Sequence, residues 1–342
     1  MTILHVREPG AVVRRDAERL RVTLKDPTTR HQRELHAIPV RDVEQVMLYG
    51  NVQLTTQAAE LCLRHQVDVI FAGAMGGYRG RLARDGSRYA RLRHAQLRRS
   101  DRQQLSLEIA APLVRAKLAG QRYLLNRLTE QVSRDSAATL HAAATAVGRL
   151  QADTARALTL DALRGYEGKG SALYFGALRT LLHADWSFQT RQYHPPPDPF
   201  NALLSFGYTL LLKEMETIAQ RVGLDPYIGC LHSLEYGRPS LVLDLMEEFR
   251  PLVVDYAMLD LALGKTLQPK DFTFTGRGDR PVELGPKLIP LVIRAYENRA
   301  NDRIRHKPSD AEQRLRTCYE LQARIYARTV LGDRARYEGV LA

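Results

Sequence analysis

Long apolar runs are absent from this 342-residue sequence. No stretch reaches the ~18 consecutive apolar residues of a membrane-spanning helix, so an integral membrane protein is excluded. The N-terminus has no basic segment followed by an apolar core, so no secretory signal is expected. Three widely spaced cysteines form neither a disulfide framework nor a Cys-x-x-Cys zinc site. We therefore expect a cytoplasmic protein from a reducing compartment.

Acidic residues are scarce relative to basic ones. Lys and Arg number 50 against 38 Asp and Glu, which gives a formal net charge of +12. This excess indicates a polyanionic partner, with nucleic acid favoured over a membrane surface. Only eight of the 50 basic residues are lysine. Arginine suits phosphate binding, although a GC-rich genome would also favour arginine over lysine.

Short apolar stretches, often alternating with polar residues, fill the first 85 residues. This pattern is typical of β-strands, and clusters of Gly, Asp, Pro or Arg separate the stretches. One helix is expected to interrupt them, capped by Thr55 or Thr56, with an apolar face that includes Ala58 and residues 61–63. The strands are expected at residues 3–6, 11–13, 20–24, 36–40, 43–48 and 67–72.

From about residue 88 the apolar residues recur with the period of a helix. A chain of this length suggests about two domains. The predicted fold class is α+β: a small N-terminal β-sheet or β-sandwich domain, residues 1–87, followed by a larger all-α catalytic domain, residues 88–342. Helices are expected at residues 92–97, 105–132, 137–160, 173–182, 201–211, 240–249, 283–298 and 308–331.

The segment where the two expected domains meet is strongly basic. Residues 76–102 hold nine arginines against two aspartates, a local net charge of +7. Because such a run can neutralise several phosphates, we expect Arg79, Arg84 and Arg88 to contact DNA. The alternative is a solvated linker followed by a surface helix. No spacing here matches a base-reading motif, which favours contacts to the DNA backbone.

Three stretches place residues that can bind metal beside glycines or prolines. In Gly165–Gly170, Glu167 is expected where a loop enters a helix, although such an acid is also a common partner of the helix dipole. His232 precedes a turn, and a structural role is its alternative. Asp244 and Glu247 are three residues apart and share one face of the expected helix. They either bind a cation or form a solvated pair.

These residues together form a candidate metal site. Carboxylates satisfy a hard cation such as Mg²⁺, and one imidazole shifts the preference toward Mn²⁺. Zinc is less suited, because Cys230 is a lone thiol and no second histidine is clustered with His232. The residues alone therefore indicate a Mg²⁺ or Mn²⁺ site.

Three strings occur in order along the chain: YEGKGSALYF at residues 166–175, RQYHPPPDPFNALLSFGY at 191–208 and HSLEYGRPSLVLDLMEEFRP at 232–251. Together they resemble the CRISPR-associated spacer-acquisition endonuclease or integrase, which is the larger, metal-dependent subunit of the CRISPR adaptation complex. The resemblance covers essentially the whole chain. It extends to the order of a β-rich N-terminus and a helical remainder.

The resemblance implies that Glu167, His232 and Glu247 hold Mg²⁺ or Mn²⁺ and are catalytic. Asp244 matches a further acidic position beside the metal, where it would assist a second ion or orient a ligand or water. Arg238 matches a basic position and is expected to touch phosphate. The family also implies a homodimer through the N-terminal domain. Its usual partner is a small ferredoxin-like CRISPR-associated adaptation subunit, which bridges two such dimers.

The implied reaction is metal-dependent phosphoryl transfer on double-stranded DNA. A 3′-hydroxyl of a captured fragment attacks a phosphodiester at the leader-side end of a CRISPR repeat, and a second attack follows on the other strand. With water as the nucleophile, the same site would cut DNA. Two alternatives stay open: a metal-dependent hydrolytic nuclease acting on branched or linear DNA, and a non-catalytic DNA-binding scaffold.

Overall fold

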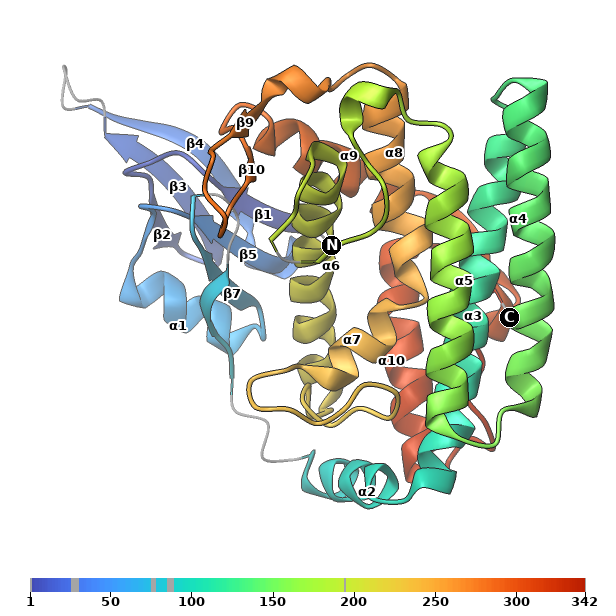
Figure 1. The fold of residues 1–342 in the computed structure, drawn as a ribbon. Coiled ribbons are helices and arrows are strands. Elements are labelled where there is room, and N and C mark those ends of the chain that lie inside the picture. The colour runs from blue at the N-terminus through green and yellow to red at the C-terminus, as the bar shows by residue number, and fades with distance from the viewer. Residues whose placement is uncertain (1, 26–30, 75–77, 85–88, 194, 342) are drawn as a thin grey trace. The chain divides into compact units, whose positions relative to one another are not determined.

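Strands form the first part of the chain and helices dominate the rest (Figure 1). The computed structural model describes residues 2–25, 31–74, 78–84, 89–193 and 195–341. The chain divides into two compact units, residues 1–87 and residues 88–342. The α+β prediction is confirmed, whereas the predicted roles of the units, dimerisation and catalysis, stay predictions. In the described ranges, no helix is long and apolar enough to cross a membrane.

Two four-stranded sheets make up the N-terminal unit. In order across the first sheet, the strands are β1 (Thr2–Val6), β5 (Val43–Tyr49), β7 (Asp68–Ala72) and β8 (Tyr78–Leu82). In order across the second, they are β4 (Gln32–Pro39), β3 (Arg19–Lys25), β2 (Val12–Asp16) and β6 (Gln53–Leu54). In the first sheet β1, β5 and β7 run parallel, while β8 pairs with β7 in the antiparallel direction.

Apolar side chains from both sheets and from helix α1 (Thr56–Arg64) form the core of this unit. The predicted helix start is confirmed, since the Thr55 hydroxyl accepts a hydrogen bond of 3.3 Å from the backbone N–H of Ala58. Alternate strand residues point inward, as the period of two requires. Buried examples are Val13, Val22, Val46 and Val69.

Strand β8 lies within the basic segment and was not predicted. Its sequence, YRGRL, has too few apolar residues to reveal a strand, but it pairs along the edge of β7. Arg79 lies on this strand and Arg84 follows it, and both are exposed. Arg88 lies outside the described residues. The N-terminal unit therefore contributes two of the three arginines expected to contact DNA.

The second unit contains the long helices. They are α2 (Ala90–Ser100), α3 (Gln103–Thr129), α4 (Arg134–Asp153), α5 (Leu160–Arg179), α6 (Pro199–Val222), α7 (Ser240–Met246), α8 (Tyr256–Leu263), α9 (Ile289–Asn301) and α10 (Leu315–Leu331). Helices α3, α4 and α5 lie side by side (Figure 1). Two short hairpins were not predicted: β9 with β10 (Phe272–Phe274, Val282–Leu284) and β11 with β12 (Arg303–His306, Ala311–Arg314). The second hairpin occupies the expected start of the last helix, so α10 begins at Leu315 and not at residue 308.

Helix α5 corrects the expectation for Glu167. The chain was expected to form a loop around the glycines at 165, 168 and 170, but α5 runs through all three. The Thr159 hydroxyl caps it by accepting a hydrogen bond from the N–H of Ala162 (3.1 Å). Each glycine costs a helix about 1 kcal/mol, and at Gly170 the end of the Leu118 side chain fills the space where a β-carbon would lie. Glu167 therefore lies in mid-helix, facing α3.

Helix α7 ends at Met246, earlier than the expected residue 249. Pro251 has no backbone N–H, and its ring crowds the carbonyl four residues earlier, so a regular α-helix cannot continue through it. A turn and a π-helical segment, Arg250–Asp255, lead instead into α8. Glu247 and Glu248 both fall in this turn.

Helix α6 begins at Pro199, two residues before the expected start. The Asp198 carboxylate accepts a hydrogen bond of 2.8 Å from the backbone N–H of Asn201 and so caps the helix. Proline is favoured in the first turn, because its missing N–H would have no helical partner there.

Candidate metal centre

A buried carboxylate, Asp244, organises one side of the site. It lies on α7 and is fully inaccessible to solvent. Its oxygens accept hydrogen bonds from the backbone N–H groups of Cys230 (2.6 Å), Leu231 (3.0 Å) and His232 (2.9 Å). Gly229 allows this close approach, because a β-carbon there would lie 2.7 Å from Asp244 Oδ2. The loop that carries His232 is thereby fixed against α7.

The same carboxylate orients the imidazole of His232. Nδ1 of His232 lies 2.7 Å from Asp244 Oδ1. Because a carboxylate only accepts, Nδ1 donates the hydrogen bond, and Nε2 is the ring nitrogen that Asp244 does not hold. A histidine held this way is the usual arrangement of a metal-binding imidazole. Nε2 faces Glu247, whose Oε1 is 3.9 Å away.

Glu247 lies among cations. Arg250 Nε forms an ion pair of 3.0 Å with its Oε1, and Lys117 Nζ lies 2.5 Å from its Oε2. Burial raises the pKa of Glu247, but Arg250, Lys117 and His232 more than offset this and lower the pKa to about 2. Glu247 is therefore a charged carboxylate, although only 3% of its surface is exposed.

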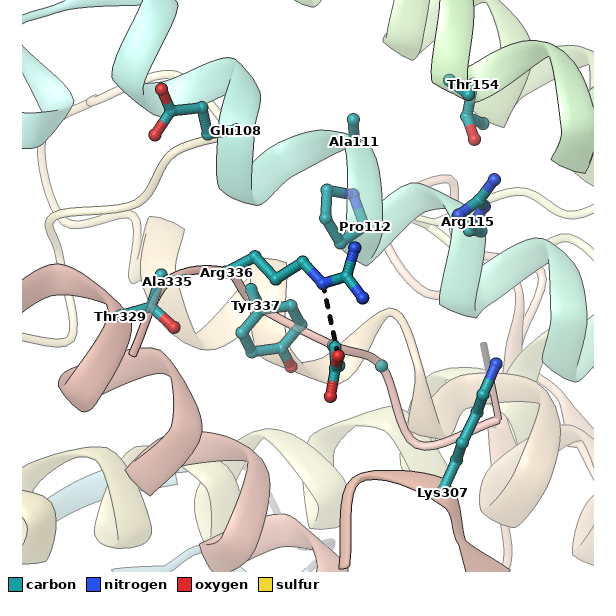
Figure 2. A pocket seen from close by; sticks show the side chains of 13 residues that line it. Glu108, Ala111, Pro112, Arg115, Thr154, Lys307, Thr329, Ala335, Arg336 and Tyr337 are labelled. Atoms are coloured by element: carbon teal, nitrogen blue, oxygen red, sulfur yellow. Dashed lines mark hydrogen bonds and ion pairs between the residues drawn. The ribbon is translucent and has the colours of Figure 1, made fainter. Parts of the chain in front are cut away.

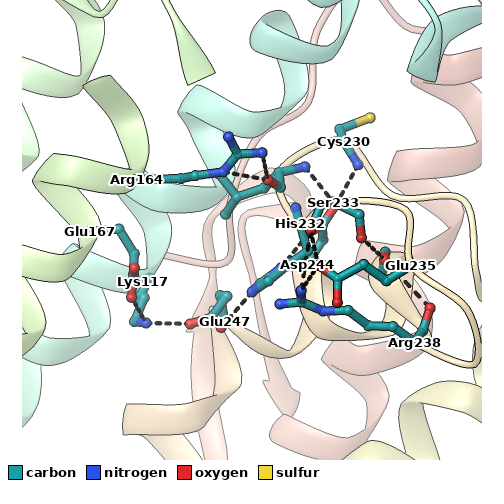
Figure 3. Close-up of polar contacts among 12 residues, drawn as sticks. Lys117, Arg164, Glu167, Cys230, His232, Ser233, Glu235, Arg238, Asp244 and Glu247 are labelled. Carbon is teal, nitrogen blue, oxygen red and sulfur yellow. Dashed lines mark hydrogen bonds and ion pairs between the residues drawn. The ribbon is translucent and has the colours of Figure 1, made fainter. Parts of the chain in front are cut away.

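Lys117 of α3 joins Glu247 to Glu167 (Figure 3). Its ammonium contacts Glu167 Oε1, which also accepts a hydrogen bond of 3.1 Å from Ser171 Oγ one turn later on α5. Burial lowers the pKa of Lys117, but Glu247 and Glu167 outweigh burial and hold the pKa above its ordinary value. The ammonium is therefore charged in the interior of the unit.

Sequence reasoning missed Lys117, although a signal was present. The buried stripe of α3 runs through Ala110, Val114, Leu118 and Leu125, and Lys117 lies within it. A lysine on an apolar stripe is almost never fully buried unless it is paired. Its position thus indicated partners of opposite charge on a neighbouring helix.

The donor types fit a hard divalent cation, since they combine two carboxylates with one imidazole whose Nε2 is not held by Asp244. Within the described residues, no group of three or more His, Cys, Asp or Glu residues lies close enough to hold an ion as it stands. The Lys117 ammonium lies between Glu167 and Glu247 and accounts for this spacing. The chemistry of the donors fits the predicted ion, and the geometry includes a cation that was not predicted.

Arg238 lies in the loop between His232 and α7. Its Nη1 forms an ion pair of 2.8 Å with Glu235 Oε1 and donates a hydrogen bond of 3.2 Å to Ser233 Oγ. Contacts in the helical unit thus link Glu167, His232, Asp244 and Glu247, while Arg238 is held by Glu235 and Ser233 of its own loop. Arg79 and Arg84 belong to the N-terminal unit instead.

Two of the hollows that described residues line lie in the helical unit. The smaller, of about 260 Å³, adjoins the site and is lined by Lys117, Glu167, Arg191 and Arg250 among others. Both arginines lie over the ring of Tyr208, at 5.2 and 4.6 Å from its centroid. The larger, of about 630 Å³, lies between α3 and the C-terminal segment, and none of the predicted site residues lines it (Figure 2). The smaller hollow therefore reaches Glu167 and has three cationic side chains, Lys117, Arg191 and Arg250, in its lining.

A family model described as CRISPR associated protein Cas1 matches residues 4–298. This chain belongs to the Cas1 family. The Cas1 endonuclease 3 of Thermus thermophilus is 36% identical over 301 residues, which cover 88% of this chain and 86% of the relative. The Cas1 endonuclease 2 of Rhodospirillum rubrum is 32% identical over 345 residues, which cover 98% and 97%.

Solved structures share the Cas1 fold. A Cas1 protein from Thermotoga maritima aligns with a TM-score of 0.77 at 22% identity, covering all of this chain and 99% of the other. A casposase bound to its integration product aligns with a TM-score of 0.79 at 22% identity, covering 99% and 93%. A chain of a Cas6-RT-Cas1–Cas2 complex aligns with a TM-score of 0.78 at 22% identity, covering 99% of this chain and 36% of that longer one.

Proposed function

We propose that this Cas1-family chain is a metal-dependent DNA integrase that inserts captured DNA into a CRISPR array. Family membership makes it a CRISPR-associated nuclease or integrase. The observation that carries the finer proposal is the imidazole of His232. Asp244 fixes it with Nε2 directed at Glu247, in a unit where Glu247 also shares a cation with Glu167.

Glu167, His232 and Glu247 would hold the ion, which is Mg²⁺ or Mn²⁺. When bound, such an ion lowers the pKa of an attacking hydroxyl and neutralises charge on phosphate oxygens. Asp244 keeps the proton on Nδ1 of His232 and thereby keeps the lone pair of Nε2 available. Lys117, Arg191 and Arg250 give the adjoining hollow a positive lining that favours a phosphodiester.

The step itself exchanges one phosphoester bond for another. The 3′-oxygen of the captured strand forms a bond to phosphorus, the bond from phosphorus to the 3′-oxygen of the target strand breaks, and the proton of the attacking hydroxyl passes to solvent or to the leaving oxygen. Holding both DNA ends in one geometry supplies much of the rate. Water in place of the hydroxyl gives cutting, as the names of the curated relatives state for those proteins.

We further propose a homodimer formed through the N-terminal unit, with a small ferredoxin-like adaptation subunit as partner. The support is that one structural neighbour is solved in a complex that contains Cas2. Exposed arginines such as Arg79 and Arg84 would hold DNA backbone. Arg238 would contact phosphate after release from its pair with Glu235.

A joining assay tests the function. A labelled short duplex is incubated with a plasmid carrying a CRISPR repeat, in Mn²⁺, Mg²⁺ or EDTA, with and without the small partner. Wild type is compared with His232→Ala and with His141→Ala, which removes an exposed histidine of α4. We expect metal-dependent joined product that disappears only in His232→Ala. Cutting without joining would establish a hydrolytic nuclease, and DNA binding indifferent to metal and to His232 would establish a scaffold.

A further inference from the structure

A lysine side chain lies between two carboxylates of the candidate metal centre. Lys117 projects from α3 toward Glu167 of α5 and Glu247 beyond α7, and only 7% of its surface is exposed (Figure 3). Burying an unpaired ammonium is very costly, whereas two carboxylates compensate it. The three elements thus meet around one fixed positive charge.

The oxygens that Lys117 uses are informative. It contacts Oε1 of Glu167 and Oε2 of Glu247. The remaining oxygen of Glu247, Oε1, is the one that faces His232 Nε2. In the described part of the chain, Oε2 of Glu167 has no hydrogen-bond or ion-pair partner. Glu167 can therefore keep Oε1 on Lys117 and give Oε2 to a metal ion, whereas Oε1 of Glu247 would face the ion while it is also paired with Arg250 Nε (3.0 Å).

His232 is arranged in a similar way. Asp244 holds one ring nitrogen, and the other faces Glu247, where the ion would bind. Lys117 would orient the carboxylates of Glu167 and Glu247, as Asp244 orients the imidazole of His232. Groups of this kind orient metal ligands in many sites, and their loss typically lowers activity about 10- to 100-fold. Lys117 differs from Asp244 in its positive charge, which also repels the ion.

Charge also limits how many ions can bind. The two carboxylates, Glu167 and Glu247, lie beside two buried cations, Lys117 and Arg250. The formal charges of these four groups cancel, so each added divalent ion makes the centre more positive. A second ion, as in two-metal phosphoryl transfer, would face the repulsion of both cations.

We propose that Lys117 is a positioning residue of the metal centre, that its ammonium stays between Glu167 and Glu247 when the ion binds, and that it restricts the centre to one divalent ion. This inference rests on the proposed function in one respect, namely that Glu167, His232 and Glu247 bind the ion. It adds a role for a residue outside that ligand set.

The test replaces the charge at nearly constant length, with Lys117→Met. Mn²⁺ is titrated into the full-length protein, and bound ions are counted by calorimetry and by EPR. We expect one ion in the wild type and two in the variant, with the first bound at least about tenfold more tightly, because the repulsion is gone. We also expect DNA joining to fall by about 10- to 100-fold despite the tighter binding, because the carboxylates lose their orienting group.

A spectroscopic readout checks that the ammonium stays. In protein labelled with ¹⁵N at the lysine side chains, pulsed EPR of bound Mn²⁺ should show a nitrogen coupling that is absent from Lys117→Met. The matched control is Lys169→Met, which removes an exposed lysine two residues from Glu167 and should leave the ion count and the coupling unchanged. Thermal unfolding in EDTA reports whether each variant folds, and Lys117→Gln replaces Lys117→Met if the latter does not.

Each contrary outcome is distinct. Lys117→Met could bind Mn²⁺ more tightly and join DNA as well as the wild type, while the wild type shows no nitrogen coupling. This result would mean that the ion displaces Lys117, and it would overturn the proposal. An unchanged ion count in a folded Lys117 variant overturns it as well. Failure of the wild type to bind Mn²⁺ would overturn it together with the metal part of the proposed function. Failure of the wild type to join DNA, with the ion count and coupling as expected, would overturn the proposed function alone.

Discussion

Two neighbouring glutamates in the turn after α7 have opposite surroundings. Both Glu247 and Glu248 are almost completely buried. The pKa of Glu247 is lowered to about 2, because Arg250, Lys117 and His232 outweigh the effect of burial. The pKa of Glu248 is raised to about 7, because burial dominates there. One peptide bond thus separates a carboxylate held in its charged form from one that burial drives toward its neutral form.

The partners of Glu248 explain the difference. It accepts hydrogen bonds from the hydroxyl of Tyr337, from Gln322 Nε2 (3.1 Å) and from the backbone N–H of Val340 (2.7 Å). These donors are neutral, and they offset only part of the cost of burying a charge. They tie the C-terminal segment to the end of α7. Burial alone does not decide whether a carboxylate is charged, and the neighbouring cations separate the predicted metal ligand from its structural neighbour.

The largest effect is expected from Glu247→Gln. This change leaves Lys117 and Arg250 buried with one carboxylate fewer, and breaking a buried ion pair costs about 3–5 kcal/mol. Denaturant unfolding in EDTA at pH 7 measures this loss. DNA joining should fall at least about a hundredfold, since even groups that orient metal ligands contribute up to that factor. An unchanged unfolding free energy would show that the cations do not depend on Glu247.

Glu248→Gln should have a smaller effect that depends on pH. A pKa raised in the folded state stabilises the fold fully below the unfolded pKa, and that stability is lost as the pH rises through the folded pKa. For Glu248 the loss begins above pH 4.5, continues through about pH 7 and amounts to about 3 kcal/mol. Unfolding free energies of both proteins in EDTA, from pH 4 to pH 8.5, test this. The decline should be smaller by that amount in Glu248→Gln, while Asp255, whose pKa is raised to about 6, retains its own part in both.

Glu247 provides a second test of the comparison, because its pKa is shifted in the opposite direction to that of Glu248. Its lowered pKa gives stability that is present above pH 4.5 and is lost as the pH falls through about 2. Acid unfolding of Glu248→Gln should therefore resemble the wild type. A Glu248→Gln protein that loses its acid transition, or that keeps the whole decline toward pH 8.5, would contradict these assignments.

The smallest effect is expected from Tyr337→Phe. The change removes one donor to Glu248, and hydrogen bonds to charged groups contribute about 1.5–3 kcal/mol against roughly 1 kcal/mol for neutral ones. The loss of unfolding free energy should therefore be greater at pH 8.5 than at pH 4. DNA joining should be unchanged, because Glu248 lies outside the proposed metal ligands. An equal loss at both pH values would mean that Glu248 keeps its proton throughout.

The sequence predicted well whatever depends on near neighbours in the chain. The alternation of apolar residues identified most strands of the N-terminal unit, and Thr55 identified the start of α1. Strand β8 was missed because YRGRL carries no such alternation and owes its conformation to β7. The loop expected at Glu167 was wrong because a glycine also serves where two helices pack closely, and spacing does not distinguish the two uses.

The sequence predicted the residue types of the site but not the hydrogen bonds and ion pairs between them. Glu167, His232 and Glu247 stand out as polar groups beside glycines and prolines. The Asp244 carboxylate accepts hydrogen bonds from residues 230–232. The ion pairs of Lys117 join it to residues that are 50 or more positions away in the sequence. Such contacts follow from tertiary packing. No periodicity in the sequence reports them.

Gly170 lies where α5 packs against side chains of α3. It lies one turn after Glu167 on α5, and the neighbour of Lys117 on α3, Leu118, fills the space where its side chain would be. Adding one methyl group at this position would force the end of the Leu118 side chain to move. The change would alter no charged group, yet it would disturb the packing beside the contact between Lys117 and Glu167. The surroundings of an ion pair in the centre therefore depend on a residue that has no side chain.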